Sequence, residues 1–201
     1  MMITRSALVL PILVSALSAA PVKFFDQKPV EISRIGPDAV LVDFGKVAFG
    51  NLQLTPPAGT EGRLTVHFGE DFKDGRINRT PPGTVRYNLT TFEFSGGKPV
   101  IAAPPVDKKN TSTNDDRHPP AILTPAEWGV IMPFRWVEIE GWPGELKPGQ
   151  ITRRAAFSAN WDDDAAAFAS SDPTLNAIWD LCRYSIKATT FAGVYVDGDR
   201  E

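Results

Sequence analysis

The sequence has a single cysteine, Cys182, and only two histidines, His67 and His118. One cysteine cannot form a disulfide within the chain, which excludes a disulfide-stapled scaffold. Cys182 falls on the apolar face of an expected helix, so a small buried side chain is favoured over a reactive thiol. Both histidines lie in a differently organised part of the chain, which argues against a cysteine–histidine nucleophile.

An excess of positive charge is also missing. Lys and Arg total 21 against 24 Asp and Glu, and the net charge is -3. This balance gives no reason to expect nucleic acid or an anionic membrane as a partner. The acidic groups Asp162–Asp164 and Asp115, Asp116 with His118 are typical of solvated segments, because their spacing matches no known metal frame. We therefore expect neither a metal nor another cofactor.

No apolar run is long enough to cross a bilayer comfortably. The run from Ala7 to Leu17 follows Arg5 and precedes three small residues, which is the pattern of a secretory signal. Pro21 disfavours a cut after Ala20, so we expect cleavage after Ser18 and a signal peptide over residues 1–18. The protein is then exported to the periplasm or the cell exterior. A buried segment or a short anchor is the alternative.

Apolar residues alternate with polar ones between about Pro29 and Ala156, and turn-forming Gly, Pro and Asp separate the alternating runs. Short strands with such turns predict an antiparallel β-sandwich or jelly roll over residues 19–156. The alternating positions include Leu52 and Leu54; Leu64, Val66 and Phe68; Phe92 and Phe94; and Val137 and Ile139.

The period changes after Phe157. Asp172 followed by Pro173 predicts a helix start, since the carboxylate caps free N–H groups and proline takes the first helical position. Apolar residues then recur at helical spacing to about Thr190. A β region followed by a helix indicates a second unit over residues 157–201, which we interpret as the start of a truncated α-helical catalytic domain.

Aromatic residues gather at Trp128, Phe134, Trp136 and Trp142. Such a group can stack on a sugar, but alternation places some of its members inside the sandwich. Core packing is therefore favoured over a binding surface.

The final residues, Asp197-Gly-Asp-Arg-Glu201, place three carboxylates and one guanidinium within five positions. Neighbouring carboxylates raise one another's pKa, because like charges resist a second ionisation. A carboxylic acid kept protonated in this way can protonate a leaving oxygen, as in glycosidases, while Arg200 holds a neighbouring acid or a sugar hydroxyl. An ordinary charged loop is the alternative reading of the same residues.

Several segments stand out along the chain: Val42-Asp-Phe-Gly45, His67-Phe-Gly-Glu70, Pro82-Gly-Thr-Val-Arg-Tyr87, Phe134-Arg-Trp-Val-Glu-Ile-Glu-Gly141, Ser171-Asp-Pro-Thr-Leu-Asn-Ala-Ile-Trp179 and Val196-Asp-Gly-Asp-Arg-Glu201. Together they resemble bacterial alpha-L-rhamnosidases of the six-hairpin glycosidase class, glycoside hydrolase family 78. They follow one another in the expected order and cover most of the chain beyond the signal peptide.

The resemblance implies a β-sandwich in front of an (α/α)6 barrel and inverting hydrolysis. Glu201 then matches the general acid, and Asp197 matches an acid that binds the sugar. The commoner family pattern is Asp-Cys-Pro-x-Arg-Glu, which has one residue more before the glutamate. Asp197 and Asp199 therefore both remain candidates for the sugar-binding role, with Arg200 beside them. The family's catalytic base lies outside this chain.

We therefore expect the N-terminal part of an exported inverting glycoside hydrolase that acts on terminal alpha-L-rhamnosides, with a carbohydrate as its substrate. We expect the chain alone to be inactive. The alternative is a β-sandwich module without catalysis that binds carbohydrate or only supports a neighbour. The segment from Asp172 to Glu201 separates the two, since a self-contained module should end near residue 156.

Overall fold

Twelve strands, one α-helix and two short 3-10 helices form the part of the chain that the computed structural model describes, residues 22–105, 126–191 and 194–195. The helices are η1 (Ala126–Trp128), η2 (Pro148–Gln150) and α1 (Pro173–Thr189). The strands are β1 (Val22–Gln27), β2 (Glu31–Arg34), β3 (Ala39–Leu54), β4 (Glu61–Gly69), β5 (Phe72–Lys73), β6 (Arg76–Ile77), β7 (Tyr87–Ser95), β8 (Val100–Ala102), β9 (Met132–Glu140), β10 (Ile151–Ser158), β11 (Thr190–Phe191) and β12 (Val194–Tyr195).

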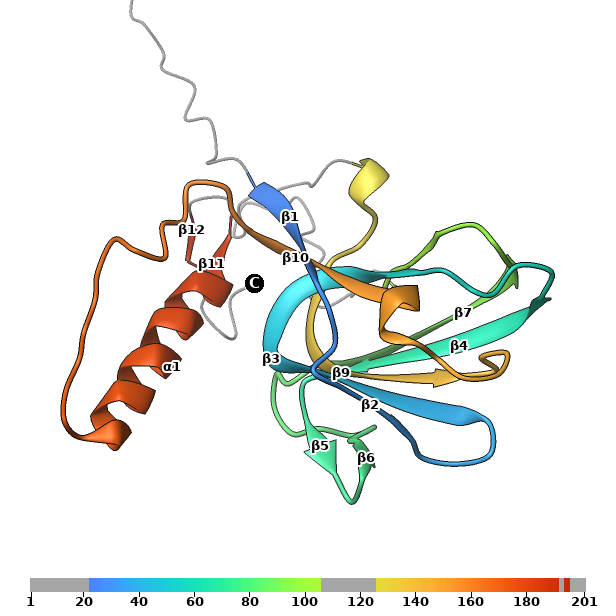
Figure 1. Ribbon diagram of the computed structural model, residues 1–201, viewed down its shortest axis with the longest axis horizontal. Coiled ribbons are helices and arrows are strands. Elements are labelled where there is room, and N and C mark those ends of the chain that lie inside the picture. The colour runs from blue at the N-terminus through green and yellow to red at the C-terminus, as the bar shows by residue number, and fades with distance from the viewer. Residues whose placement is uncertain (1–21, 106–125, 192–193, 196–201) are drawn as a thin grey trace, which may run out of the picture.

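Antiparallel pairing joins eight of these strands into one curled sheet in the order β1-β10-β3-β9-β4-β7, with β2 and β8 also paired to β3. Residues 40–43 of β3 pair with β2, residues 50–54 pair with β10 and in part with β8, and β9 pairs with residues 39–43 and 48–50. The long strand thus passes from one layer to the other, and its curve is visible in Figure 1. The expected mainly antiparallel β fold is confirmed.

The core lies between the two layers and contains the alternating apolar residues. Leu52, Leu64 and Val66 are fully buried, as are Val137 and Ile139. The ring of Phe134 packs edge-on against Phe44 and Phe68. Phe134 and Trp142 are buried in this core, which confirms core packing for these two aromatics, while Trp128 and Trp136 are only half-buried. Burial of such residues supplies most of the favourable free energy of folding.

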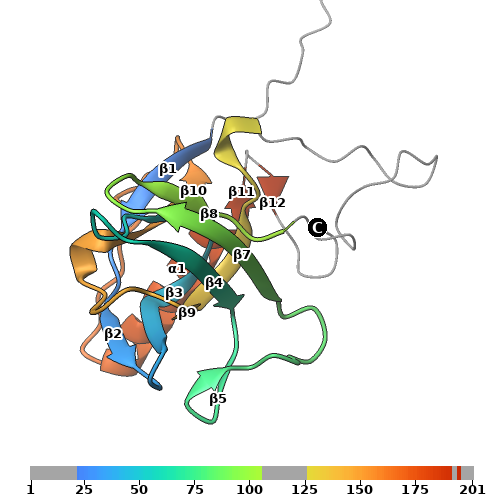
Figure 2. The same cartoon turned by 90° about the vertical axis from the view of Figure 1, so that its right-hand side faces the viewer.

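The opposite face of β4 and β9 is covered as well. Alternation places His67 and Glu138 on the polar face of half-buried strands, yet both are buried. The cover is the segment that carries the β5–β6 hairpin, which projects beyond the end of the main sheet (Figure 2). Asp74 and Gly75 form its two-residue turn with positive φ at both positions, the conformation that Asp-Gly favours in tight hairpins.

Helix α1 begins as expected. The Asp172 carboxylate accepts a hydrogen bond from the Thr174 N–H at 2.8 Å, and Pro173 is the first helical residue. The helix lies beside the curled sheet (Figure 1) and contacts β3 and β10. None of the helices among the described residues combines the length and apolar character needed to cross a membrane.

The interpretation of Cys182 as a buried residue is wrong, because its side chain is exposed. The neighbouring apolar residues Leu175, Ile178 and Leu181 are exposed too. The helix contacts the sheet through only part of its surface, and no described segment covers the rest of its apolar face. Strand β10 runs to Ser158, two residues past the expected boundary at 156. The division into residues 1–18, 19–156 and 157–201 stays a prediction.

Two leucines give a matched test of this packing. Leu52 is fully buried, whereas Leu181 is 63% exposed. We expect Leu52→Ala to lower the free energy of unfolding by about 2–5 kcal/mol, because it leaves a cavity in the core. Leu181→Ala should change it by less than about 0.5 kcal/mol. Urea denaturation of both variants measures the difference, and equal losses would contradict the packing described.

Candidate functional site

A bulge in β3 is the starting point of the candidate site. Asp43 lies opposite Trp136 of β9, but Ala48 lies opposite Phe134, so residues 44–47 leave the regular ladder. Gly45 has a φ of 79°, in the left-handed region that glycine adopts without steric cost. Bulges bend a strand and turn backbone groups away from it. Those freed groups need partners elsewhere in the molecule.

Asp43 fixes the first turn of the bulge. Its carboxylate accepts the Gly45 N–H at 2.6 Å and both Nε and Nη2 of Arg135 at 2.8 Å. Burial raises the pKa of Asp43, but the bonds from Arg135 and the Gly45 N–H outweigh it and leave the pKa below its usual value. The carboxylate is therefore ionised at neutral pH. The Arg135 guanidinium also lies over the ring of Trp136, with 4.3 Å from Cζ to the ring centroid.

Arg153 of β10 binds the backbone of the bulge at Lys46. It is 1% exposed, and its Nη1 donates to Lys46 O at 2.8 Å and to Phe134 O at 2.7 Å. Its Nε and Nη2 both donate to Gln27 Oε1 of β1. Burial lowers the pKa of Arg153 to about 10, against the favourable influence of Tyr184. The side chain still carries its charge at neutral pH.

Tyr184 attaches helix α1 to the same bulge. Its hydroxyl donates to Val47 O at 2.8 Å, and Lys46 Nζ lies 4.5 Å from its ring centroid. Burial raises the pKa of Tyr184, so the phenol remains a donor at neutral pH. Lys187 joins the helix to the segment that precedes it, since its Nζ lies 2.6 Å from the carboxylate of Asp163.

Glu138 anchors a loop that approaches the bulge from another side. Its carboxylate is fully buried on β9, where it accepts the Ile77 N–H at 2.6 Å and hydrogen bonds from Arg76 and Arg79. The buried charge is thus both paired and hydrogen-bonded, as burial in a low-dielectric interior requires. These contacts hold the segment between β4 and β7 against the sheet.

His67 belongs to the same network. Its Nδ1 lies 2.9 Å from Tyr87 Oη, while Nε2 lies 3.3 Å from Glu140 Oε1 without the alignment of a hydrogen bond. Burial lowers the pKa of His67, and the positive charge of Arg79 lowers it further, against the opposing influence of Glu140 and Glu138. The neutral imidazole is therefore the favoured form in the fold.

These attachments leave a cavity of about 580 Å³ between α1 and the sheet, which we call the helix–sheet cleft. Ligand sites in proteins span roughly 300–1,000 Å³. The bulge and β9 form the wall of the cleft on the side of the sheet. Glu70 and residues 84–86, which precede β7, form the wall on the side of the loop. The cleft is lined by residues 45–49, Glu70, Thr84, Val85, Arg86, Pro133, Arg135, Trp136, Leu181, Tyr184, Ser185, Ala188 and Thr189.

Four of the segments that carried the resemblance meet at this cleft. Residues 42–45 begin the bulge, residues 67–70 supply Glu70, residues 82–87 supply Arg86, and residues 134–141 supply Arg135. Glu70 and Arg86 also join two of these segments, because the Glu70 carboxylate accepts the Arg86 N–H at 2.6 Å. Segments far apart in the sequence therefore build one site.

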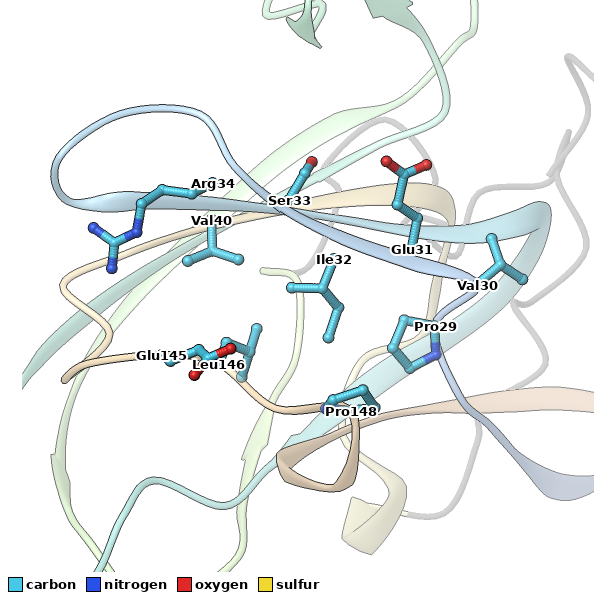
Figure 3. Close-up of a pocket in the computed structure, with 10 residues that line it drawn as sticks. All are labelled: Pro29, Val30, Glu31, Ile32, Ser33, Arg34, Val40, Glu145, Leu146 and Pro148. Carbon is cyan, nitrogen blue, oxygen red and sulfur yellow. The ribbon is translucent and has the colours of Figure 1, made fainter.

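A second cavity, of about 540 Å³, lies at the edge of the sheet beside β2 (Figure 3). Ile32, Val40 and Leu146 form part of its wall, and all three belong to the hydrophobic core or pack against it. Glu31, Arg34 and Glu145 also line it. The helix–sheet cleft is the stronger candidate because it gathers more cationic and hydroxyl groups around one space.

The four residues expected to act on substrate, Asp197, Asp199, Arg200 and Glu201, lie outside the described residues. The described chain leads up to them: β11 pairs with β12, and Thr190 lies opposite Tyr195. Strand β11 in turn contacts β10. The group Asp115, Asp116 and His118 also lies outside the described residues.

The fold of the chain is similar to that of three solved alpha-L-rhamnosidase structures. The alpha-L-rhamnosidase from Dictyoglumus thermophilum matches with a TM-score of 0.60 and 15% identity over 86% of this chain and 17% of that one. The Streptomyces avermitilis alpha-L-rhamnosidase complexed with L-rhamnose matches with a TM-score of 0.59 and 15% identity, over 87% of this chain and 15% of that one. The native alpha-L-rhamnosidase from Aspergillus terreus matches with a TM-score of 0.64 and 16% identity, over 90% of this chain and 18% of that one.

At these identities the likeness shows a shared fold, and the chain spans less than a fifth of each of these three proteins. No protein-family model and no curated protein sequence matches the chain. The β-sandwich thus has the architecture found in alpha-L-rhamnosidases.

Sequence reasoning missed the cleft itself, and with it Lys46, Arg135 and Tyr184. Arg135 stands in a strand whose alternation predicts only an outward polar position. Tyr184 looks like one more residue of an amphipathic helix. The available signal was the set of resembling segments, since segments that share one resemblance are candidates to meet in space.

Loss of one hydroxyl tests the attachment of α1. Tyr184→Phe removes the hydrogen bond to Val47 O and leaves this carbonyl unsatisfied, so we expect the free energy of unfolding to fall by about 0.5–1.5 kcal/mol. Amide hydrogen exchange in α1 should also quicken. Ser185→Ala is the matched control, because its hydroxyl bonds only within the helix. Unchanged exchange in Tyr184→Phe would show that the contact does not hold the helix.

His67 predicts a pH dependence of stability. Its pKa is lowered in the fold, so the unfolded chain binds more protons once the pH falls below about 6.5. The free energy of unfolding should therefore decrease as the pH falls through and below this value. His67→Asn should flatten the dependence between about pH 7 and pH 5, whereas His118→Asn, the change at the other histidine, should retain it. Identical profiles for the two variants would refute the assignment.

Proposed function

We propose that this chain is the N-terminal part of an exported, inverting glycoside hydrolase that cleaves terminal alpha-L-rhamnosides. The observation that carries the proposal is the extent of the fold likeness. The match to the first rhamnosidase covers 86% of the chain, which is more than residues 1–156 can provide. The likeness therefore extends past the sandwich into residues 157–201.

The surface of α1 supports a larger catalytic domain. Leu175, Ile178 and Ile186 are all more than 40% exposed, and they recur at helical spacing. Exposed apolar residues gathered on one face mark a surface that another element covers. Further helices of an (α/α)6 barrel would supply that cover.

Glu201 is the proposed general acid, which protonates the glycosidic oxygen as the bond to the anomeric carbon breaks. Asp197 or Asp199 binds sugar hydroxyls, and Arg200 orients a neighbouring carboxylate. Inversion also requires a base that activates water on the opposite face of the sugar, with the two carboxyl groups roughly 6.5–9.5 Å apart. That base belongs to the remainder of the proposed enzyme, so the chain alone should not hydrolyse an aryl rhamnoside.

A leaving-group series tests the role of Glu201 in a protein that contains this chain and the barrel. Glu201→Gln should lose turnover of alkyl rhamnosides by at least about 100-fold, because general acid catalysis contributes roughly 10²–10⁴. Nitrophenyl rhamnosides should suffer less, because a good leaving group needs little protonation. Asp197→Asn is the matched comparison and should impair all substrates alike. Equal losses across the series for Glu201→Gln would remove it from the acid role.

Two further readouts separate the proposed enzyme from a non-catalytic module. NMR of the first product should show β-L-rhamnose, as inversion at an alpha-linkage demands. The 201-residue chain by itself should show no turnover above its own Glu201→Gln variant. Retention of configuration would overturn the mechanism, and activity of the isolated chain would overturn the need for a barrel.

A further inference from the structure

We propose that the helix–sheet cleft binds a saccharide that carries a carboxylate, and that this saccharide lies on the leaving-group side of the substrate. The first part stands on the cleft alone, whereas the second part rests on the proposed function. The evidence is the charge of the cleft, its rigid construction, its mixed lining and its place along the chain.

The cleft carries a surplus of positive charge, whereas the whole protein has a net negative charge. The chain has a net charge of -3, yet Lys46 and Arg135 line the cleft, and its two other charged lining residues, Glu70 and Arg86, are of opposite sign and bonded to each other. The Asp43 carboxylate offsets only one of the two guanidinium groups beside it, Arg135 and Arg153, so one positive charge remains in addition to that of Lys46. A cavity with a surplus of positive charge favours an anionic ligand, and the planar guanidinium group matches a carboxylate in shape.

The cationic groups are held in place before any ligand arrives. Two bonds to Asp43 and the ring of Trp136 fix the Arg135 guanidinium, and the ring of Tyr184 supports Lys46 Nζ. The hydrogen bonds to Asp43 use Nε and Nη2 of Arg135, so the N–H groups of Nη1 take no part in the pair with Asp43. A site whose donors are already oriented loses little conformational entropy when a ligand binds.

The rest of the lining suits a sugar better than a simple anion. The lining includes the apolar residues Pro133, Val85 and Leu181 and the hydroxyl-bearing residues Thr84 and Ser185. A pyranose presents the same mixture, because its ring has apolar C–H faces and a rim of hydroxyls. The volume of about 580 Å³ also exceeds what a small inorganic anion fills.

The cleft lies within chain reach of the acidic residues. Thr189 lines the cleft, Thr190 follows it, and Tyr195 pairs with Thr190. Six residues then lead from Tyr195 to Glu201, a reach of at most about 20 Å when fully extended. A sugar in the cleft is thus close enough to belong to the same substrate as the bond that Glu201 is proposed to protonate.

Binding to the 201-residue chain tests the ligand class without any catalysis. Methyl alpha-D-glucuronide is titrated into labelled protein and followed by NMR, with methyl alpha-D-glucoside as the neutral match and acetate and sulfate as simple anions. We expect the glucuronide to bind at least about tenfold more tightly than each of the other three, and to shift signals of the bulge and of α1 residues 181–189. Equal affinity for the glucoside or for acetate, or no binding, overturns the proposal.

Variants locate the site. Lys46→Gln removes an exposed charge at the cleft, and Ser185→Trp fills it from the exposed side of the helix. Each should weaken glucuronide binding at least about fivefold, a modest change for the loss of one charged partner. Lys98→Gln, in the turn between β7 and β8, is the matched charge control and should bind normally. Unchanged binding in both cleft variants would place the sugar elsewhere.

The leaving-group assignment has its own readout. In the longer enzyme, Lys46→Gln should raise KM for a rhamnosyl glucuronide about fivefold more than it raises KM for a rhamnosyl glucoside. Failure of all rhamnosides to react would count against the proposed function, while the binding result on the 201-residue chain would still stand. Equal KM changes for both substrates would overturn the assignment.

Discussion

The buried guanidinium of Arg153 is the interaction on which the rest of this structure depends. It joins β1 through Gln27, the bulge through Lys46 O and β9 through Phe134 O, and it lies beside Tyr184 of α1. Its hydrogen-bond partners are neutral oxygens, so the charge is stabilised by several dipoles. Removing one of these oxygens would leave part of a buried charge without a hydrogen-bond partner, which costs far more free energy than such a bond contributes on balance. The bulge, the first strand and the helix therefore hold together as a unit.

The bulge gives up regular pairing in β3 and gains a surface that faces the helix. Its carbonyls at Lys46 and Val47 accept from Arg153 and Tyr184 instead of from a neighbouring strand. Asp43 closes the bulge at its start, and Arg135 holds Asp43. An interruption that looks like a defect in the ladder is thus the feature that attaches a helix to a sandwich and leaves a polar cleft between them.

Local sequence signals predicted most of the fold. Alternation found the strands whose residues fill the core, and Asp172 with Pro173 marked the first turn of α1. The failures occur where burial depends on distant residues. His67 and Glu138 occupy a polar face that another segment covers, and Cys182 occupies an apolar face that no described segment covers. Neither outcome is encoded within a few residues of the position concerned.

The cleft could not be predicted for the same reason, because residues 46, 70, 135 and 184 meet only through the curl of the sheet and the bulge. This arrangement also bears on the shortened spacing before Glu201. Tyr184 holds α1 to the sandwich, and the pairing of Thr190 with Tyr195 continues that attachment. The chain is therefore anchored up to residue 195. In the sequence, the one residue that is missing relative to the resembling pattern falls between Asp197 and Arg200, just beyond this anchored part. Gly198 stands at this point of the sequence, and glycine tolerates backbone conformations closed to other residues.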